Sequence, residues 1–121
     1  MKYKSTALAI AWTFVVLLLY ALPGYTVRYN EPWEWMRLDK LVHFSIFFLL
    51  NYLWIAAFSN RTTKRSMVIT LAIISYGAIL EGFQSSWFVE RTSDLQDFIA
   101  NSAGAILALP LSLIKLKPQL K

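Results

Sequence analysis

The sequence predicts an all-α integral membrane protein, a bundle of four transmembrane helices with both termini in the cytoplasm. Hydrophobic residues make up 57% of the 121 residues, whereas soluble domains contain about 45–50%. Charged residues make up 16%, against about 25% in soluble domains. The charges leave four long apolar stretches, and a helix needs roughly 17–25 mostly apolar residues to cross a bilayer. We expect one transmembrane domain over residues 1–121.

The four apolar stretches predict helices over residues 5–23, 39–59, 66–87 and 96–115. The first stretch follows a basic N-terminus and could also be a secretory signal peptide. Its apolar run is long, however, and is followed by Pro23 and Gly24 instead of a small-residue cleavage site. We therefore predict a retained helix. Between the first two helices, Pro32 can begin a short interfacial helix that leads to Leu38.

The distribution of lysine and arginine predicts the orientation, because cytoplasmic loops carry an excess of both. Eight of the 12 basic residues fall on one side: Lys2, Lys4, Arg61, Lys64, Arg65, Lys115, Lys117 and Lys121. The other four are Arg28, Arg37, Lys40 and Arg91. Both termini are therefore predicted to be cytoplasmic. All seven acidic residues belong to the opposite, outer side, and since acids contribute little to insertion, this asymmetry favours a function there.

Composition excludes several kinds of site. The chain has no cysteine, so disulfides, thiolate metal sites and cysteine nucleophiles are absent. Its net charge of +5 comes from short segments between apolar stretches, where positive charge sets topology. No basic patch is interleaved with aromatic residues as in a nucleic-acid groove, and we predict no nucleic-acid partner.

Three of the predicted helices carry polar side chains near their outer ends. In the second helix, His43 follows Asp39 by four residues, so the two share a face and His43 lies ~6 Å deeper. In the fourth, Asn101 follows Asp97 at the same spacing. Glu81 is the deepest acid, and because a charge at the bilayer centre costs roughly 2.5–3.5 kcal/mol on insertion scales, it should face the bundle interior.

We predict that these polar side chains meet in one shallow outer pocket. The candidate catalytic residues are His43, Glu81 and Asp39. The candidate substrate-binding residues are Arg91, Lys40, Gln84, Asp94, Asp97 and Asn101. Gly77 and Gly104 lie near this pocket and would permit close helix approach.

Each of these residues also has a purely structural explanation. Asp39 and Asp97 can cap helix N-termini, Asn101 and Gln84 can form interhelical hydrogen bonds, and a single histidine can simply be packed. We favour the functional interpretation because several costly polar residues are predicted to gather at one place.

Three segments resemble the signature blocks of VanZ-like membrane proteins. They are LDKLVHFSIFFLL (38–50), YGAILEGFQ (76–84) and ERTSDLQDFIANSAGAILA (90–108). The corresponding family patterns are D-K-x-x-H-F, Y-G-x-x-x-E-x-x-Q and R-x-x-[SD]-x-x-D-x-x-x-N-x-x-G. The matching positions are Asp39, Lys40, His43, Glu81, Gln84, Arg91, Asp94, Asp97, Asn101 and Gly104. Three blocks in order on a four-helix chain are a specific resemblance; the first helix matches only in being hydrophobic.

The resemblance implies a multi-pass protein of the bacterial cytoplasmic (inner) membrane. The family takes its name from a protein associated with resistance to the glycopeptide teicoplanin, and many relatives occur without other resistance genes, which implies a general cell-envelope role. The family has been grouped by shared pattern with membrane enzymes that exchange or hydrolyse lipid head groups. Membrane lipids or a lipid-linked envelope precursor are then the expected partners, and a homo-oligomer is possible for a chain of this size.

A mechanistic hypothesis places a phosphate-linked lipid head group in the pocket. Arg91 and Lys40 would neutralise the phosphate, since arginine matches its oxygens with a planar fork. His43 would act as general base or nucleophile, oriented by Asp39 or Glu81. Glu81 could instead be the general acid.

A metal is a weaker expectation. Asp94 and Asp97 offer oxygen ligands that could hold a divalent cation, but no spacing in the sequence is diagnostic. The cofactor is therefore unknown, and the sequence assigns no metal ligand.

Two rival functions belong to other classes. A non-catalytic membrane protein would bind a lipid-linked precursor or an antibiotic and release no product. A small exporter is the weaker rival, because such exporters place a working acid in the middle of the first helix, and here that helix carries no charge between Ser5 and Val27.

Overall fold

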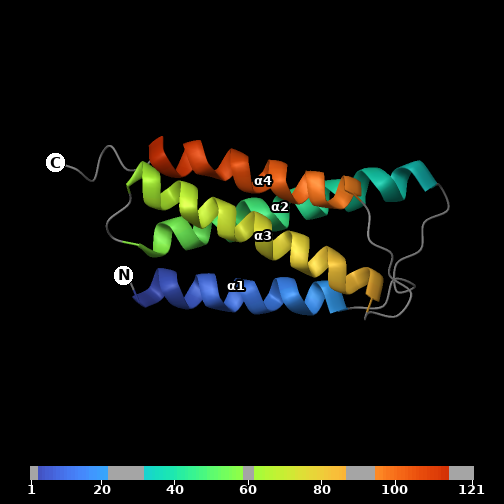
Figure 1. Ribbon diagram of the computed structural model, residues 1–121, viewed down its shortest axis with the longest axis horizontal. Helices are drawn as coiled ribbons and strands as arrows, with labels where there is room; N and C mark the ends of the chain where they lie inside the picture. The colour runs from blue at the N-terminus through green and yellow to red at the C-terminus, as the bar shows by residue number, and fades with distance from the viewer. Residues whose placement is uncertain (1–2, 22–31, 59–61, 87–94, 115–121) are drawn as a thin grey trace.

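The computed structural model describes residues 3–21, 32–58, 62–86 and 95–114. These residues form four α-helices, α1 (Tyr3–Ala21), α2 (Pro32–Ala57), α3 (Thr63–Ser86) and α4 (Leu95–Ile114). Figure 1 shows the helices side by side, with successive helices running in opposite directions, so that α1 begins and α4 ends at the same end of the bundle. The predicted all-helical fold is confirmed for the described residues.

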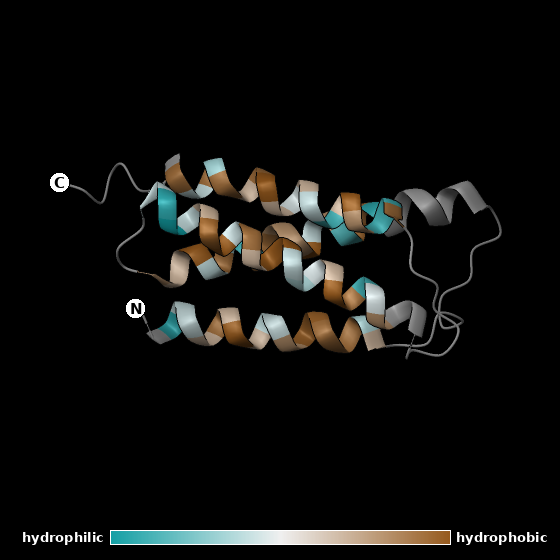
Figure 2. Cartoon of the chain, viewed as in Figure 1, coloured by the Kyte–Doolittle hydropathy of each residue, from teal (hydrophilic) through white to brown (hydrophobic). Residues whose placement is uncertain are grey.

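Three helices contain segments long and apolar enough to cross a membrane. The segments are Lys4–Ala21, Lys40–Ala57 and Thr63–Phe83. Large apolar side chains such as Leu18 and Leu71 are more than half exposed on the outside of the bundle, where lipid would cover them, and Figure 2 shows hydrophobic residues along every helix. The chain is therefore a multi-pass membrane protein. The crossing by α4 and the cytoplasmic location of the termini stay predictions.

All four helices begin earlier than the sequence predicts, and the differences are largest for α2 and α3. The helix that begins at Pro32 continues without interruption to Ala57, so the separate interfacial helix ending at Leu38 is wrong. Proline is favoured in a first helical turn, because the N–H groups there have no partner within the helix and the N–H that proline lacks is not needed. The third helix begins at Thr63 because Thr62 caps it: its Oγ1 accepts a hydrogen bond from the Arg65 N–H at 3.1 Å.

The core contains side chains from all four helices. Its buried members are Val16, Tyr20, Phe47, Leu50, Ile73, Leu80 and Ala105. Away from the end where α1 finishes, Asn51 on α2 joins two other helices, donating to Thr70 Oγ1 at 2.9 Å and to the Ala105 carbonyl at 2.7 Å. Such side-chain bonds hold helices together where lipid supplies no hydrophobic drive.

The backbones of α2 and α4 approach most closely at Gly104. A Cβ atom added there would lie 2.1 Å from the Phe44 carbonyl oxygen and 3.1 Å from the Phe48 nitrogen. The predicted close helix approach is therefore found at Gly104. At Gly77 the nearest neighbour of an added Cβ is the flexible Phe47 ring, at 3.0 Å, so that contact is less constrained.

We expect Gly104→Ala to destabilise the bundle by about 1–3 kcal/mol, because the added methyl must push the α2 and α4 backbones apart. Gly82→Ala is the matched control, since a Cβ there meets nothing within 4 Å. It should be neutral or stabilising by up to about 1 kcal/mol through helix propensity. Thermal unfolding in detergent checks both; equal midpoints for the two variants would contradict the close contact.

Candidate functional site

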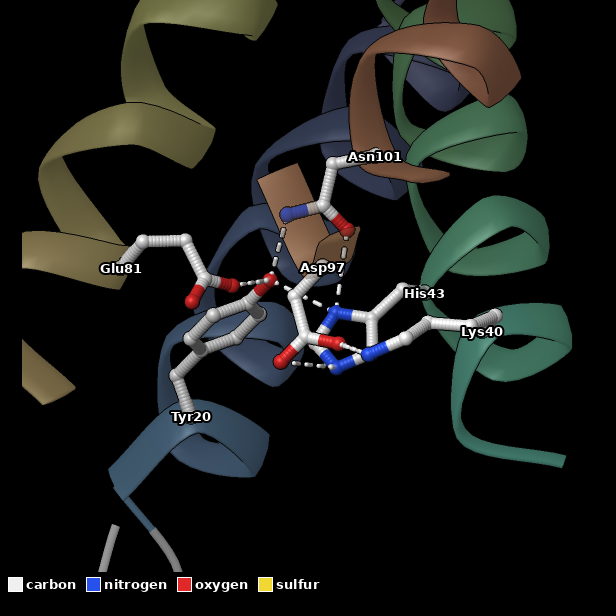
Figure 3. Close-up of polar contacts among 6 residues, drawn as sticks. All are labelled: Tyr20, Lys40, His43, Glu81, Asp97 and Asn101. Atoms are coloured by element: carbon white, nitrogen blue, oxygen red, sulfur yellow. Dashed lines mark hydrogen bonds and ion pairs between the residues drawn. The ribbon is translucent and has the colours of Figure 1, made fainter. Parts of the chain in front are cut away.

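Six polar side chains meet at the end of the bundle where α1 finishes and α4 begins. Figure 3 shows Tyr20 on α1, Lys40 and His43 on α2, Glu81 on α3, and Asp97 and Asn101 on α4, all directed toward one another. Except for Lys40, all are less than 10% exposed. We call these six residues the polar cluster.

Helical spacing puts the α2 and α4 members on shared faces. Lys40 and His43 are three residues apart, and Asp97 and Asn101 are four apart, so each pair projects from one side of its helix. The remaining members come singly from α1 and α3. Because exposure to lipid is costly for such groups, the helices turn these faces inward.

Tyr20 is the centre of the hydrogen-bond network. Its hydroxyl donates to Glu81 Oε1 at 3.0 Å and accepts from Asn101 Nδ2 at 2.6 Å. It also lies 2.9 Å from His43 Nδ1. One phenol oxygen therefore links all four helices.

The hydrogen bond that Tyr20 donates to Glu81 sets the direction of the other bonds in this network. Tyr20 has one hydroxyl proton, and a carboxylate oxygen can only accept it. Asn101 then donates its amide N–H to Tyr20, which turns its carbonyl oxygen toward His43 Nδ1 at 3.0 Å. Since that oxygen is also an acceptor, Nδ1 must carry a proton. A neutral His43 consequently presents an Nε2 lone pair.

Asp97 lies on the Nε2 side of the imidazole. Its Oδ2 is 3.7 Å from His43 Nε2, while its Oδ1 pairs with Lys40 Nζ. The Lys40 side chain is 24% exposed, so it lies at the rim of the cluster. A partly exposed cation thus lies beside the buried imidazole and carboxylates.

We expect Tyr20→Phe to cost about 1–3 kcal/mol, because it removes the shared hydroxyl and leaves buried polar partners behind. Tyr76→Phe is the matched control: its hydroxyl makes a part-buried bond to the Thr13 carbonyl at 3.1 Å. A single interhelical bond in a membrane averages only about 0.6 kcal/mol. Unfolding in bicelles measures both losses, and an equal loss for the two would argue against the central role of Tyr20.

The structure brings together five of the nine residues singled out from the sequence: Lys40, His43, Glu81, Asp97 and Asn101. The backbones of Asp39 and Gln84 lie in α2 and α3, but their side chains are not among those described. Arg91 and Asp94 lie outside the described residues. Their roles stay predictions.

The structure describes part of the surroundings of His43. The sequence predicted that Asp39 or Glu81 orients the imidazole. Nδ1 lies within hydrogen-bond distance of Asn101 and Tyr20, and Glu81 reaches this network through the tyrosine hydroxyl. The part that Asp39 plays stays a prediction, since its side chain is outside those described. Asn101 is therefore a positioning residue for His43 as well as a candidate for substrate binding.

Tyr20 was missed in the sequence because no motif contains it. A tyrosine near the end of an apolar helix is usually explained as an aromatic residue at the membrane–water interface. The available signal was its depth: it is the last tyrosine before the end of the first apolar stretch, level with the other outer polar residues.

The arrangement can support proton transfer and can bind an anion. An imidazole with one nitrogen held by an amide oxygen presents its other nitrogen in a defined direction. A lysine at the rim can attract phosphate as a point charge. Two buried carboxylates and an imidazole also form a group able to hold a metal ion, since one ligand atom each from His43, Glu81 and Asp97 lie within 4.8 Å of one another.

Comparison with known proteins agrees with the resemblance of the motifs. The "Uncharacterized protein C11E3.10" of Schizosaccharomyces pombe (strain 972 / ATCC 24843) is 30% identical over 114 residues, which cover 93% of this chain and 67% of the yeast protein. No solved structure matches the chain significantly. Because this relative is a yeast protein, the comparison indicates no bacterial membrane. Residues 4–116 match VanZ/LLP1, and the chain belongs to this family.

Proposed function

We propose that the polar cluster acts on the phosphate-linked head group of a membrane lipid or a lipid-linked envelope precursor, by transfer or hydrolysis of the phosphoester. The observation that carries the proposal is the position of His43: its Nδ1 is held by Asn101, and its Nε2 faces the Asp97 carboxylate, which pairs with the partly exposed Lys40. A site near one end of an apolar bundle suits a substrate whose tails stay in lipid. The lysine and arginine distribution predicts that this end is the outer one.

In the proposed reaction, an oxygen of water or of an incoming alcohol attacks phosphorus. As the new O–P bond forms, His43 Nε2 takes the proton of the attacking oxygen. The bond between phosphorus and the leaving oxygen then breaks, and the imidazolium returns the proton to that oxygen. The histidine ends in its starting form, and no oxidant or reductant is required.

The other members of the cluster support this step. Lys40 neutralises the phosphate at the rim, and Arg91 is predicted to join it. Asn101 keeps the Nδ1 proton in place, so that Nε2 stays the basic nitrogen. Tyr20 connects the Glu81 carboxylate to this pair and lets its negative charge stabilise a transient imidazolium.

The test is head-group turnover by the purified chain in vesicles that contain phosphatidylglycerol and a polyprenyl-phosphate precursor, with mass spectrometry of the extracted lipids. The proposal predicts a new lipid species that accumulates beyond one equivalent of protein. A stoichiometric protein–lipid complex without product would favour the non-catalytic binder. Absence of both product and bound lipid would overturn the proposal.

A further inference from the structure

The buried imidazole and the two buried carboxylates of the polar cluster point to a ligand that the proposed function does not require. His43, Glu81 and Asp97 are each between 6% and 7% exposed, and one ligand atom from each lies within 4.8 Å of the others. They come from three different helices, so their meeting is a product of the tertiary fold and not of one sequence motif.

The geometry between His43 and Asp97 fits two ligands of one ion. Nε2 and Oδ2 are 3.7 Å apart, longer than an N–H···O hydrogen bond. Two ligands ~2.1 Å from a zinc-like ion and separated by that distance subtend about 124° at the metal, some 15° wider than the tetrahedral angle. Two ligands of a tetrahedral ion lie ~3.4 Å apart, so a pair at the 4.8 Å limit would have to approach by about 1.4 Å when the ion binds.

The surroundings of His43 are those of a metal-bound histidine. Histidine ligands donate their second ring N–H to an oxygen, which sets the tautomer and the ring orientation. Here Asn101 Oδ1 takes that place at Nδ1, and the Nε2 lone pair faces a carboxylate oxygen. Two lone pairs that face each other repel unless a proton or a cation lies between them.

Charge within the cluster favours a cation as well. Among its described side chains, two carboxylates face one lysine, which leaves one negative charge when the imidazole is neutral. Lys40 pairs with Asp97 Oδ1, and Tyr20 bonds Glu81 Oε1. Each carboxylate has a second oxygen, so these bonds can persist while a cation binds. Burial of an uncompensated charge is costly, and a divalent ion that carries one hydroxide would bring the net charge of the cluster to zero.

We propose that His43 Nε2, one oxygen of Glu81 and one oxygen of Asp97 hold a divalent cation that accepts mixed nitrogen and oxygen ligands, such as Zn²⁺. Three protein ligands leave an open position for water or a phosphate oxygen. The cation would polarise the phosphate and lower the pKa of bound water. This inference concerns the same site as the proposed function and assigns Nε2 to the metal; water bound to the ion would then supply the attacking oxygen, and its proton would pass to the leaving oxygen instead of to His43.

The chain offers a direct test because His43 is its only histidine. Protein labelled with ¹⁵N-histidine, purified with a histidine-free tag and placed in nanodiscs, is titrated with Zn²⁺ and followed by NMR. We expect saturation at one Zn²⁺ per chain, a shift of the Nε2 resonance, and an Nδ1 that keeps its proton. An Nε2 resonance unchanged by excess Zn²⁺, or one that shows a retained proton, would overturn the inference.

Variants locate the carboxylate ligands. Asp97→Asn should weaken Zn²⁺ binding by about 100-fold or more, since even outer-shell partners of a metal contribute 10–100-fold. Thr70→Ala is the control, because Thr70 is a buried polar residue whose contacts are with Asn51 and the Ser66 carbonyl, and it should bind Zn²⁺ like the unmodified chain. Equal affinity in Asp97→Asn and Thr70→Ala would count against the site.

One further comparison separates this inference from the proposed function. If turnover survives complete removal of metal by a chelator and no Zn²⁺ binds, the metal site is wrong and the head-group reaction stands. If Zn²⁺ binds at Nε2 and no lipid product forms, the metal site stands and the reaction is wrong.

Discussion

His43→Ala is expected to lower head-group turnover by about 10²–10⁴-fold, the usual contribution of a positioned acid–base group. The side chain is buried and bonded through Nδ1. The substitution therefore removes an imidazole that is held in one orientation. Initial rates of lipid product formation in proteoliposomes measure it. Binding of the lipid should change far less than the rate, because the rim lysine remains.

Two comparisons make this result interpretable. Thr70→Ala removes a buried hydroxyl elsewhere in the bundle and should leave turnover unchanged. Glu81→Gln keeps the shape of the side chain and removes its charge, so it should lower turnover by less than His43→Ala. Undiminished turnover in His43→Ala would remove the imidazole from the mechanism.

Lys40→Met is expected to destabilise the bundle by about 3 kcal/mol, because it leaves the Asp97 carboxylate buried beside no ammonium group. Removing the carboxylate and keeping the lysine should lower the free energy of unfolding by less. In Asp97→Asn the lysine loses its partner, but its side chain is 24% exposed and can extend to the interface, so about 1 kcal/mol is expected. Unfolding free energies in bicelles decide the order, and an equal or larger loss for Asp97→Asn would contradict it.

The sequence could predict that the site residues converge. It shows how deep each polar side chain lies in the membrane, and the free energy of exposing such a side chain to lipid is high. His43, Glu81 and Asn101 lie at similar depths near one end of their helices, and a buried polar group in a membrane needs polar neighbours. Their meeting in one cluster agrees with that expectation. The apolar stretches likewise predicted the helices, since a bilayer crossing requires a minimum apolar length.

The pairing inside the cluster was not predictable in the same way. Spacing gives depth and face, but not the rotation of each helix or which helices are neighbours. The partner of His43 is expected from the sequence on its own helix or on α3, and spacing gives no sign of the contacts with Asn101 of α4 and Tyr20 of α1. The early helix starts at Pro32 and Thr63 depend on local capping that a hydropathy pattern does not contain.

The contact at Gly104 has a consequence for natural variation of this chain. Every other amino acid carries the Cβ atom that would meet the Phe44 carbonyl at 2.1 Å, so no missense change of this codon leaves helix packing untouched. At Gly82, where the same atom meets nothing within 4 Å, many alleles should be tolerated. In a saturation library, codon 104 should therefore be depleted of every variant, while codon 82 keeps a broad spectrum.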